Sequence, residues 1–216
     1  MSAPSAVRTI LITGFEPFGG ETVNASWEAA QRLEGWRHGE HAAVARRLPC
    51  GYDASVKALV LEIEAIGPAA LLMTGQAARR AVVCVERFAH NLDDATAPDN
   101  DGDLRRGLRI SRAAPDWLEA TAPASDIVRA MKQGGIPARL SRNAGAFVCN
   151  HLYFGALAYL GGKGSPIPAV FVHLPAAPDQ TPSGASAKRM TAAKAAEALK
   201  AAAAALLDLS NLDEAA

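Results

Sequence analysis

Residues 141–160 read SRNAGAFVCNHLYFGALAYL and join an expected strand to an expected helix. An Asn-Ala-Gly turn leads to Cys149, and an apolar periodic run then continues to a Gly-Gly pair at residues 161–162. We expect this run to be a helix that follows a short strand at residues 138–141. Cys149 would then lie at or near the helix N-terminus, where unpaired backbone N–H groups and the helix dipole favour a thiolate.

The same cysteine has a second interpretation, since a free cysteine more often packs as a small apolar residue than reacts. Taken alone, the segment around Cys149 favours this packed interpretation. The rest of the chain has to decide between the two.

Length and composition limit the possible classes of protein. The chain has 216 residues, half of them apolar, which predicts one α/β domain over residues 1–216. Lys plus Arg equals Asp plus Glu, 22 each, so neither nucleic acid nor an anionic membrane is an expected partner. The cysteines Cys50, Cys84 and Cys149 are far apart, which argues against a disulfide framework and a zinc site. With no signal-peptide pattern and no long apolar run, we expect a soluble cytoplasmic protein.

Short apolar runs alternate with helical patterns along the chain. The expected strands are residues 9–13, 44–48, 70–74, 81–89, 138–141 and 168–174. The expected helices begin near Asn24 or Ser26, Asp53, Ser125, Cys149 and Ser186, the last running alanine-rich to Leu209 and packing on the sheet. Residues 90–103 are polar and should form an ordered loop. The strands are apolar on both faces, which predicts a single-domain, three-layer α/β/α fold around a mostly parallel twisted sheet.

Several chemically interesting residues lie at or just beyond the ends of expected strands. They are the glycine-rich loop 14–20, Gln76, the turn before Cys149, and His173. Ligands of such sheets bind at the carboxyl ends of the strands. This convergence favours a functional site over simple packing of Cys149.

A thiol nucleophile needs a base, and the chain has five histidines. His173 ranks first because strand order should place it beside the Cys149 helix, although a histidine at a strand end can also simply bind a backbone carbonyl. His90 remains possible, whereas His151 is two residues from Cys149 and points elsewhere on the helix. The two histidines expected at the solvated surface are His38 and His41.

Glu86 lies in an expected buried strand, where an unpaired carboxylate would cost several kcal/mol. A histidine or a backbone donor is the favoured partner. A glutamate that accepts from one imidazole nitrogen would direct the other toward the thiol and raise the histidine pKa. The alternative is a structural salt bridge to Arg79, Arg80 or Arg105.

The loop at residues 14–20, GFEPFGG, does not match a phosphate-binding loop, because it has neither a Gly-Lys-Ser/Thr ending nor a GxGxxG pattern. Phe15 and Phe18 on this glycine-rich loop are better suited to a small, flat, apolar group.

Four stretches of the chain carry a family resemblance. They are TGFEPFGGETVNAS (13–26), VERFAHNLDDATAPDN (85–100), AGAFVCNH (144–151) and VFVHLP (170–175). In this order they resemble pyroglutamyl peptidase I, the pyrrolidone-carboxylate peptidase family of cysteine peptidases.

The resemblance implies the fold, the reaction and the residues. It implies an α/β/α fold and an intracellular, commonly tetrameric enzyme without cofactor or metal, which removes N-terminal pyroglutamate from peptides through an acyl-enzyme. It makes Cys149 the nucleophile, His173 the base and Glu86 the residue that orients the base. The substrate-binding residues that it implies are Phe15, Phe18, Gln76, Phe147 and Val148.

Two departures from the family pattern concern the substrate pocket. Thr96 and Ala97 replace the arginine and isoleucine of Asp-Asp-Ala-Arg-Ile-Pro-Asp-Asn, and Gly-Gln-Ala-Gly-Gly-Arg is Gly-Gln-Ala-Ala-Arg-Arg at residues 75–80. Thr96 removes a cation expected near the site, and Ala97 widens or flattens one pocket wall. Two alternatives therefore stay open: a divergent paralogue that hydrolyses another N-acyl or lactam amide, and a non-catalytic binding protein that retains the pocket.

Overall fold

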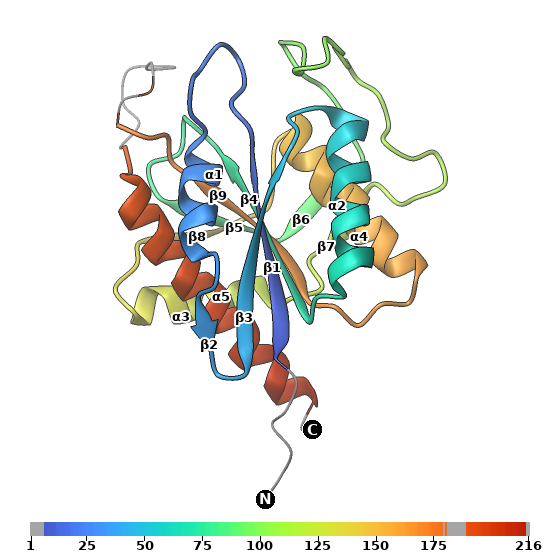
Figure 1. Cartoon of the computed structure of the whole chain (residues 1–216). Helices are drawn as coiled ribbons and strands as arrows, with labels where there is room; N and C mark the ends of the chain where they lie inside the picture. Colours follow the sequence, from blue (N-terminus) through green and yellow to red (C-terminus); the bar gives the residue numbers. More distant parts are fainter. Residues whose placement is uncertain (1–6, 179, 181–188, 215–216) are drawn as a thin grey trace, which may run out of the picture.

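A seven-stranded sheet lies at the centre of the molecule (Figure 1). The computed structural model describes residues 7–178, 180 and 189–214. The strand order is β2-β3-β1-β4-β9-β5-β8. The strands are β1 (Arg8–Phe15), β2 (Arg37–His38), β3 (His41–Leu48), β4 (Ala70–Gln76), β5 (Val83–Glu86), β8 (Ala138–Ser141) and β9 (Ala169–Leu174). All neighbouring pairs are parallel except β2 with β3 and β5 with β9, which confirms the mostly parallel sheet.

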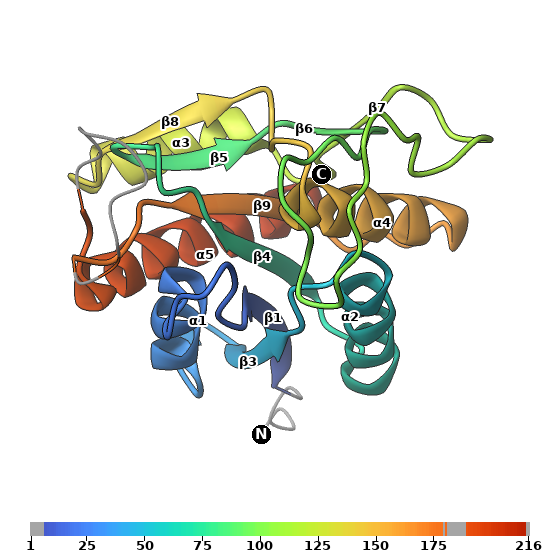
Figure 2. The ribbon, with the colours of Figure 1, turned by 90° about the horizontal axis from the view of Figure 1, so that it is seen from above.

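Helices cover both faces of the sheet (Figures 1 and 2). On one face, α1 (Ala25–Ala30), α3 (Ala124–Gln133) and α5 (Ala192–Glu214) pack against side chains such as Ile10 and Val172. On the other face, α2 (Tyr52–Ile66) and α4 (Val148–Gly162) cover Leu11, Met73 and Phe171. This alternation of buried side chains to the two faces gives the predicted three layers.

The β5 and β8 strands run against the direction of β9, which corrects the expectation that every strand before the site ends at one edge. In the pairing of β5 with β9, Cys84 lies opposite His173 and Glu86 opposite Phe171. The β8 strand is parallel to β5, so the carboxyl end of β8 points away from the edge where β4 and β9 end. The chain returns to that edge through residues 142–147 before it enters α4.

The expected strand at residues 81–89 is in fact two strands in two sheets. The β5 strand ends at Glu86, and β6 (Phe88–His90) pairs with β7 (Trp117–Glu119), which the sequence did not predict. The chain passes from one sheet to the other at Arg87. Its N–H donates to the carbonyl of Ser141 at 2.7 Å, and its carbonyl accepts from the N–H of Ala120 at 2.8 Å. These partners are distant in sequence, so an apolar run alone could not reveal the break.

Helix starts agree with the expectations only in part. Asn24 caps α1 as predicted, since its side chain accepts from the N–H of Ser26 at 3.0 Å. Asp53 does not cap α2, which begins at Tyr52 after Gly51. Instead, the N–H of Tyr52 donates to the Asp99 carboxylate at 2.8 Å, so a distant loop supplies the acceptor.

The last helix begins later than expected. It starts at Ala192, residues 189–191 are not helical, and the predicted start at Ser186 lies outside the described residues. Its buried side chains face the sheet and the neighbouring helices, as the predicted packing requires.

His41 does not lie at the solvated surface, which corrects another expectation. It is 3% exposed, because β3 begins at His41 and pairs there with both Arg8 of β1 and His38 of β2. His38 lies nearer the surface, with Nε2 at 2.7 Å from the Asp208 carboxylate.

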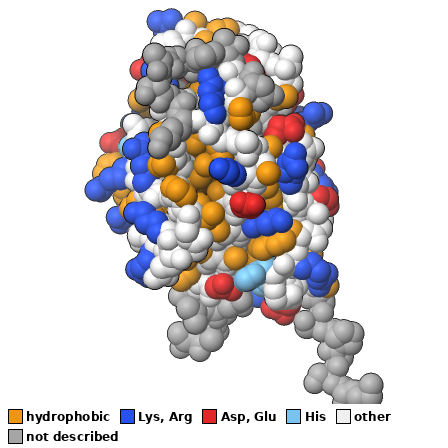
Figure 3. All heavy atoms as spheres, turned by 90° about the vertical axis from the view of Figure 1, so that its left-hand side faces the viewer, with side chains coloured by type: hydrophobic (Ala, Val, Ile, Leu, Met, Phe, Trp, Pro, Cys, Tyr) orange, Lys and Arg blue, Asp and Glu red, His pale blue; other side chains and the backbone are white. Residues whose placement is uncertain are grey.

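The face over α1, α3 and α5 carries Lys, Arg, Asp and Glu side chains among apolar ones (Figure 3). Within the described residues, no helix is long and apolar enough to cross a membrane.

Two glycines of α4 test how tightly this layer packs. A Cβ at Gly155 would lie 2.7 Å from Cγ2 of Val56 in α2, whereas a Cβ at Gly161 would meet no atom within 4 Å. We therefore expect Gly155→Ala to lower the free energy of unfolding by about 1–3 kcal/mol through overpacking. Gly161→Ala, its matched control, should raise that free energy by about 0.5–1 kcal/mol through helix propensity. Urea unfolding of both variants measures the difference, and equal effects would contradict the packing at Gly155.

Candidate active site

Cys149 is the second residue of α4, at the start of the helix as predicted. Its thiol lies close to the sheet: a Cβ placed on Gly75 would be 2.7 Å from Sγ of Cys149 and 2.8 Å from the Phe171 ring. Only glycine at this position of β4 leaves room for the sulfur. The backbone N–H groups of the first helical turn precede the first intrahelical donor, the N–H of His151, so they point out of the helix end near the thiol.

His173 lies beside this thiol because it is the register partner of Gly75 across β4 and β9. Its Nδ1 is 2.8 Å from Oε1 of Glu86, a residue with no solvent exposure. An ionised carboxylate only accepts, so Nδ1 is the protonated nitrogen of the neutral ring. The other nitrogen, Nε2, is then an unprotonated base.

Glu86 has both kinds of partner that the sequence allowed. Besides the histidine contact, Nη1 of Arg80 is 2.6 Å from the same Oε1. Of the three arginines considered, the structure brings Arg80 to Glu86, while Arg105 pairs with aspartates of the loop and of α2.

Burial decides the charge state of the resting pair. Burial raises the pKa of the Cys149 thiol, and Cys50 and Glu86 raise it further, against smaller lowering effects from Arg80 and the backbone N–H. Burial also lowers the pKa of His173 by more than the Glu86 hydrogen bond raises it. The expected raised histidine pKa is therefore wrong, because removal from water outweighs the carboxylate. Both shifts favour a neutral thiol beside a neutral imidazole in the resting site.

A cavity of about 410 Å³ opens over these groups. Its apolar walls are Phe15, Phe18 and Phe147, three of the predicted substrate-binding residues. Its polar lining includes Gln76, whose Oε1 accepts from the N–H of Ala25 at 2.8 Å. Because that oxygen is engaged, the amide NH₂ is the part of Gln76 that can donate to a ligand.

The cavity also differs from the expected set of residues. Val148 is not among the lining residues, since its side chain is 1% exposed and packs in the core. Cys50 lines the cavity but was not predicted. Its place two residues after the end of β3 was the available signal, because residues just beyond strand ends gather at this edge. Burial and nearby carboxylates, Glu16 first among them, raise the pKa of Cys50 to about 12.

A second cavity of about 330 Å³ adjoins the first. Phe18 and Phe147 line both, with ring centroids 6.1 Å apart. Thr96 and Ala97, the two departures from the family pattern, lie in the wall of this second cavity.

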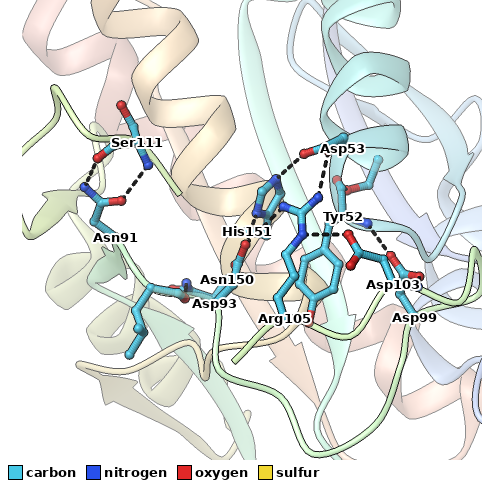
Figure 4. Close-up of polar contacts among 12 residues, drawn as sticks. Tyr52, Asp53, Asn91, Asp93, Asp99, Asp103, Arg105, Ser111, Asn150 and His151 are labelled. Atoms are coloured by element: carbon cyan, nitrogen blue, oxygen red, sulfur yellow. Dashed lines mark hydrogen bonds and ion pairs between the residues drawn. The ribbon is translucent and has the colours of Figure 1, made fainter. Parts of the chain in front are cut away.

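His151 and His90 lie away from the thiol, as their ranking implied. Nδ1 of His151 is 2.9 Å from the Asp93 carboxylate, and its Nε2 is 3.4 Å from that of Asp53 (Figure 4). Nε2 of His90 is 2.9 Å from the carbonyl of Arg142.

Arg105 joins the loop that follows β6 to the start of α2 (Figure 4). Its guanidinium contacts the carboxylates of Asp53 and Asp103 at 2.7 Å and that of Asp93 at 3.2 Å, and lies 4.5 Å from the centre of the Tyr52 ring. Tyr52 in turn packs edge-on against Phe147, at 5.6 Å between centroids. The charged cluster thus supports the wall shared by the two cavities.

Of the side chains that the structure describes, no group of three or more His, Cys, Asp or Glu is arranged to hold a metal ion.

Comparison with known proteins gives one consistent result. Residues 8–208 match the family model described as pyroglutamyl peptidase. The chain is 41% identical over 201 residues to pyrrolidone-carboxylate peptidase 2 of Photorhabdus laumondii, which covers 89% of this chain and 92% of the relative. It is 43% identical over 171 residues to the pyrrolidone-carboxylate peptidase of Gloeobacter violaceus, covering 79% of this chain and 83% of the relative.

Solved structures agree with the sequence relatives. The crystal structure of pyroglutamyl peptidase I from Bacillus amyloliquefaciens matches with a TM-score of 0.89 and 37% identity, over 94% of this chain and 98% of that one. A mutant pyrrolidone carboxyl peptidase from Pyrococcus furiosus matches with a TM-score of 0.88 and 32% identity, over 94% and 99% of the two chains. The chain therefore belongs to the pyroglutamyl peptidase family of cysteine peptidases.

Proposed function

We propose that this protein removes N-terminal pyroglutamate from peptides, with Cys149 as nucleophile, His173 as base and Glu86 as the residue that orients the base. Family membership supports the reaction. The observation that carries the residue assignment is the cavity that holds Cys149 and His173 together, with the Glu86 carboxylate 2.8 Å from Nδ1 of His173.

In the proposed reaction, Nε2 of His173 takes the thiol proton as Sγ of Cys149 attacks the carbonyl of the pyroglutamyl residue. The C–N bond of the tetrahedral intermediate breaks, and the imidazolium gives its proton to the leaving amine. A water molecule, deprotonated by His173, then attacks the thioester. Pyroglutamate leaves and Cys149 regains its proton, so the enzyme returns to the neutral pair.

Backbone N–H groups at the start of α4 are the proposed donors to the oxyanion. Phe147, the residue before the helix, has no side-chain acceptor for them, so they stay directed at the cavity end of the helix. The NH₂ group of Gln76 is a second candidate. A donor of this kind is typically worth about 3 kcal/mol in the transition state.

The apolar walls fit the chemistry of the substrate. A pyroglutamyl terminus is an uncharged lactam and has no ammonium group, so a carboxylate in the pocket would gain nothing from it. Three phenylalanine side chains line the cavity instead.

Domain number, cytoplasmic location and tetramer formation stay predictions from the sequence.

A second candidate function rests on the second cavity. Thr96 and Ala97 leave about 330 Å³ beside the shared Phe18–Phe147 wall, room that favours a divergent enzyme acting on a larger lactam or N-acyl amide. Alkylation of Cys149 does not distinguish an enzyme from a non-catalytic binding protein, because burial raises the pKa of the resting thiol in either case. Only a measurement of substrate turnover distinguishes the two.

The first prediction concerns the nucleophile. We expect the wild-type protein to release the fluorophore from pyroglutamyl-7-amido-4-methylcoumarin, and Cys149→Ala to lose at least about a thousandfold in kcat/KM. Cys84→Ala is the control, since Cys84 is buried outside the cavity. Equal rates for wild type and Cys149→Ala would remove the nucleophile assignment, and an inactive wild type would remove the proposed substrate.

The second prediction concerns pH. The base must be neutral to take the thiol proton, and the pKa of His173 lies below its ordinary value of 6.5 because of burial. The kcat/KM should therefore be level at neutral pH and fall as the pH drops through a value below 6.5. A pH profile of kcat/KM for the same amide measures this limb. A limb centred above 6.5 would contradict the neutral resting pair.

The third prediction separates the two candidate functions. If the second cavity takes part of the acyl group, wild type should hydrolyse the amide of 6-oxopiperidine-2-carboxylic acid, the six-membered lactam, alongside the pyroglutamyl amide. Ala97→Ile should then lower the ratio of kcat/KM for the six-membered lactam to kcat/KM for the pyroglutamyl amide by about tenfold or more, because the bulkier side chain fills the second cavity. Leu104→Ala, at an exposed position of the same loop, serves as control. No hydrolysis of the larger lactam by wild type would favour the narrower function.

A further inference from the structure

One carboxylate oxygen of Glu86 contacts both the imidazole of His173 and the guanidinium of Arg80. Oε1 is 2.8 Å from Nδ1 of His173 and 2.6 Å from Nη1 of Arg80. Arg80 comes from the turn that follows β4, where its N–H donates to the carbonyl of Ala77 at 2.9 Å. The guanidinium is thus brought to the buried carboxylate from the strand that also carries Gly75, on which the Cys149 thiol rests.

We propose that Arg80 is a positioning residue for the reaction: it fixes the Glu86 carboxylate, and through it the His173 ring, and joins this pair to the turn that leads into Cys149. This inference rests on the proposed function of Cys149 and His173.

The first step of the argument is the charge of Glu86. Its side chain has no solvent exposure, and a buried carboxylate without a counter-charge is costly. If His173 were the only partner, the uncompensated carboxylate would raise the pKa of the base, and burial alone would oppose this effect. Arg80, whose side chain is 16% exposed, supplies the positive charge instead. His173 can then hold its hydrogen bond to Glu86 while it remains neutral.

The second step is the other end of the same guanidinium. Nη2 of Arg80 donates to the carbonyl of Asn143 at 2.7 Å. The Asn143 side chain accepts from the N–H of Gly145 at 2.8 Å, and Gly145 has a φ of +88°, which favours glycine. Ala144 and Gly145 line the cavity just before the nucleophile. Arg80 therefore spans from the base side of the site to the turn on the nucleophile side.

Other charged or titratable groups around Glu86 and His173 do not replace this bridge. Arg139 donates through Nε to the Cys84 sulfur at 3.1 Å, and Tyr153 donates its hydroxyl to the Glu86 carbonyl at 3.0 Å. Cys149, Cys50 and Arg79 face the cavity. Arg80 acts on both members of the pair, since it lowers the pKa of His173 and that of Cys149.

Arg80→Gln tests the proposal, with Arg142→Gln as matched control. Arg142 is an exposed cation on the turn at residues 142–147, which Arg80 contacts at Asn143, and its guanidinium lies over the Phe88 ring. For Arg80→Gln we expect kcat for the pyroglutamyl amide to fall about 10- to 100-fold, the effect of losing a residue that orients a catalytic side chain, with little change in KM. The acid limb of kcat/KM should move to higher pH, because the cation that lowers the His173 pKa is gone. Arg142→Gln should keep the wild-type kcat and limb.

Arg80→Lys keeps the charge but not the forked geometry that reaches both Glu86 and Asn143. It should therefore recover the position of the acid limb more fully than kcat, and it takes the place of Arg80→Gln if that variant does not fold. An acid limb at the wild-type position in Arg80→Gln, or an equal shift in Arg142→Gln, would overturn the proposal.

Titration of the His173 ring by NMR gives a readout that does not depend on the substrate. The midpoint in Arg80→Gln should lie above that in wild type, and coincident midpoints would overturn the role of Arg80 even in an active enzyme. A wild type that is inactive on pyroglutamyl amides, but shows the shifted midpoint, would instead reject the proposed substrate and leave the Arg80 contact in place.

Discussion

The contact between Glu86 and His173 is the constraint on which the site depends. Glu86 has no solvent exposure, so its charge is tolerated only where partners approach it inside the sheet. His173 and Arg80 do so from two other strands or their ends, β9 and the turn after β4. The order β4-β9-β5 is therefore a requirement of the proposed chemistry as well as of packing, because it places His173, the proposed base, between the strand under the Cys149 thiol and the strand that carries Glu86.

The reversed direction of β5 makes this contact possible. In the antiparallel pairing, Glu86 is opposite Phe171, two residues before His173, so both side chains point to the same face of the sheet and lie diagonally across the pair. The same reversal directs β8 away from the edge where β4 and β9 end. The turn at residues 142–147 must then bring the chain back to α4, and the Arg80 hydrogen bond to Asn143 lies on this turn.

Local sequence patterns predicted the layers, most of the strands and the catalytic candidates, because strand periodicity and a lone carboxylate in an apolar run are local signals. What they missed depends on partners distant in the chain. The break at Arg87 follows from hydrogen bonds to Ser141 and Ala120, and the start of α2 from Asp99. The direction of the His173 pKa shift was also mispredicted. The sequence identified the carboxylate partner, but it could not show that burial has the larger effect.

Burial and the apolar cavity walls favour a neutral resting pair for the same physical reason. A thiolate–imidazolium pair in this cavity would be two charges removed from water, whereas a thiol and a neutral imidazole are not penalised. In the proposed reaction, charge then develops only when a substrate carbonyl is in place, where the N–H groups at the start of α4 are the proposed donors that stabilise it. The role proposed for Arg80 fits such a site, because a guanidinium 2.6 Å from Oε1 would balance the charge of Glu86 at every step. In the proposed reaction, the proton on the thiol is thus the only one that has to move at the first step.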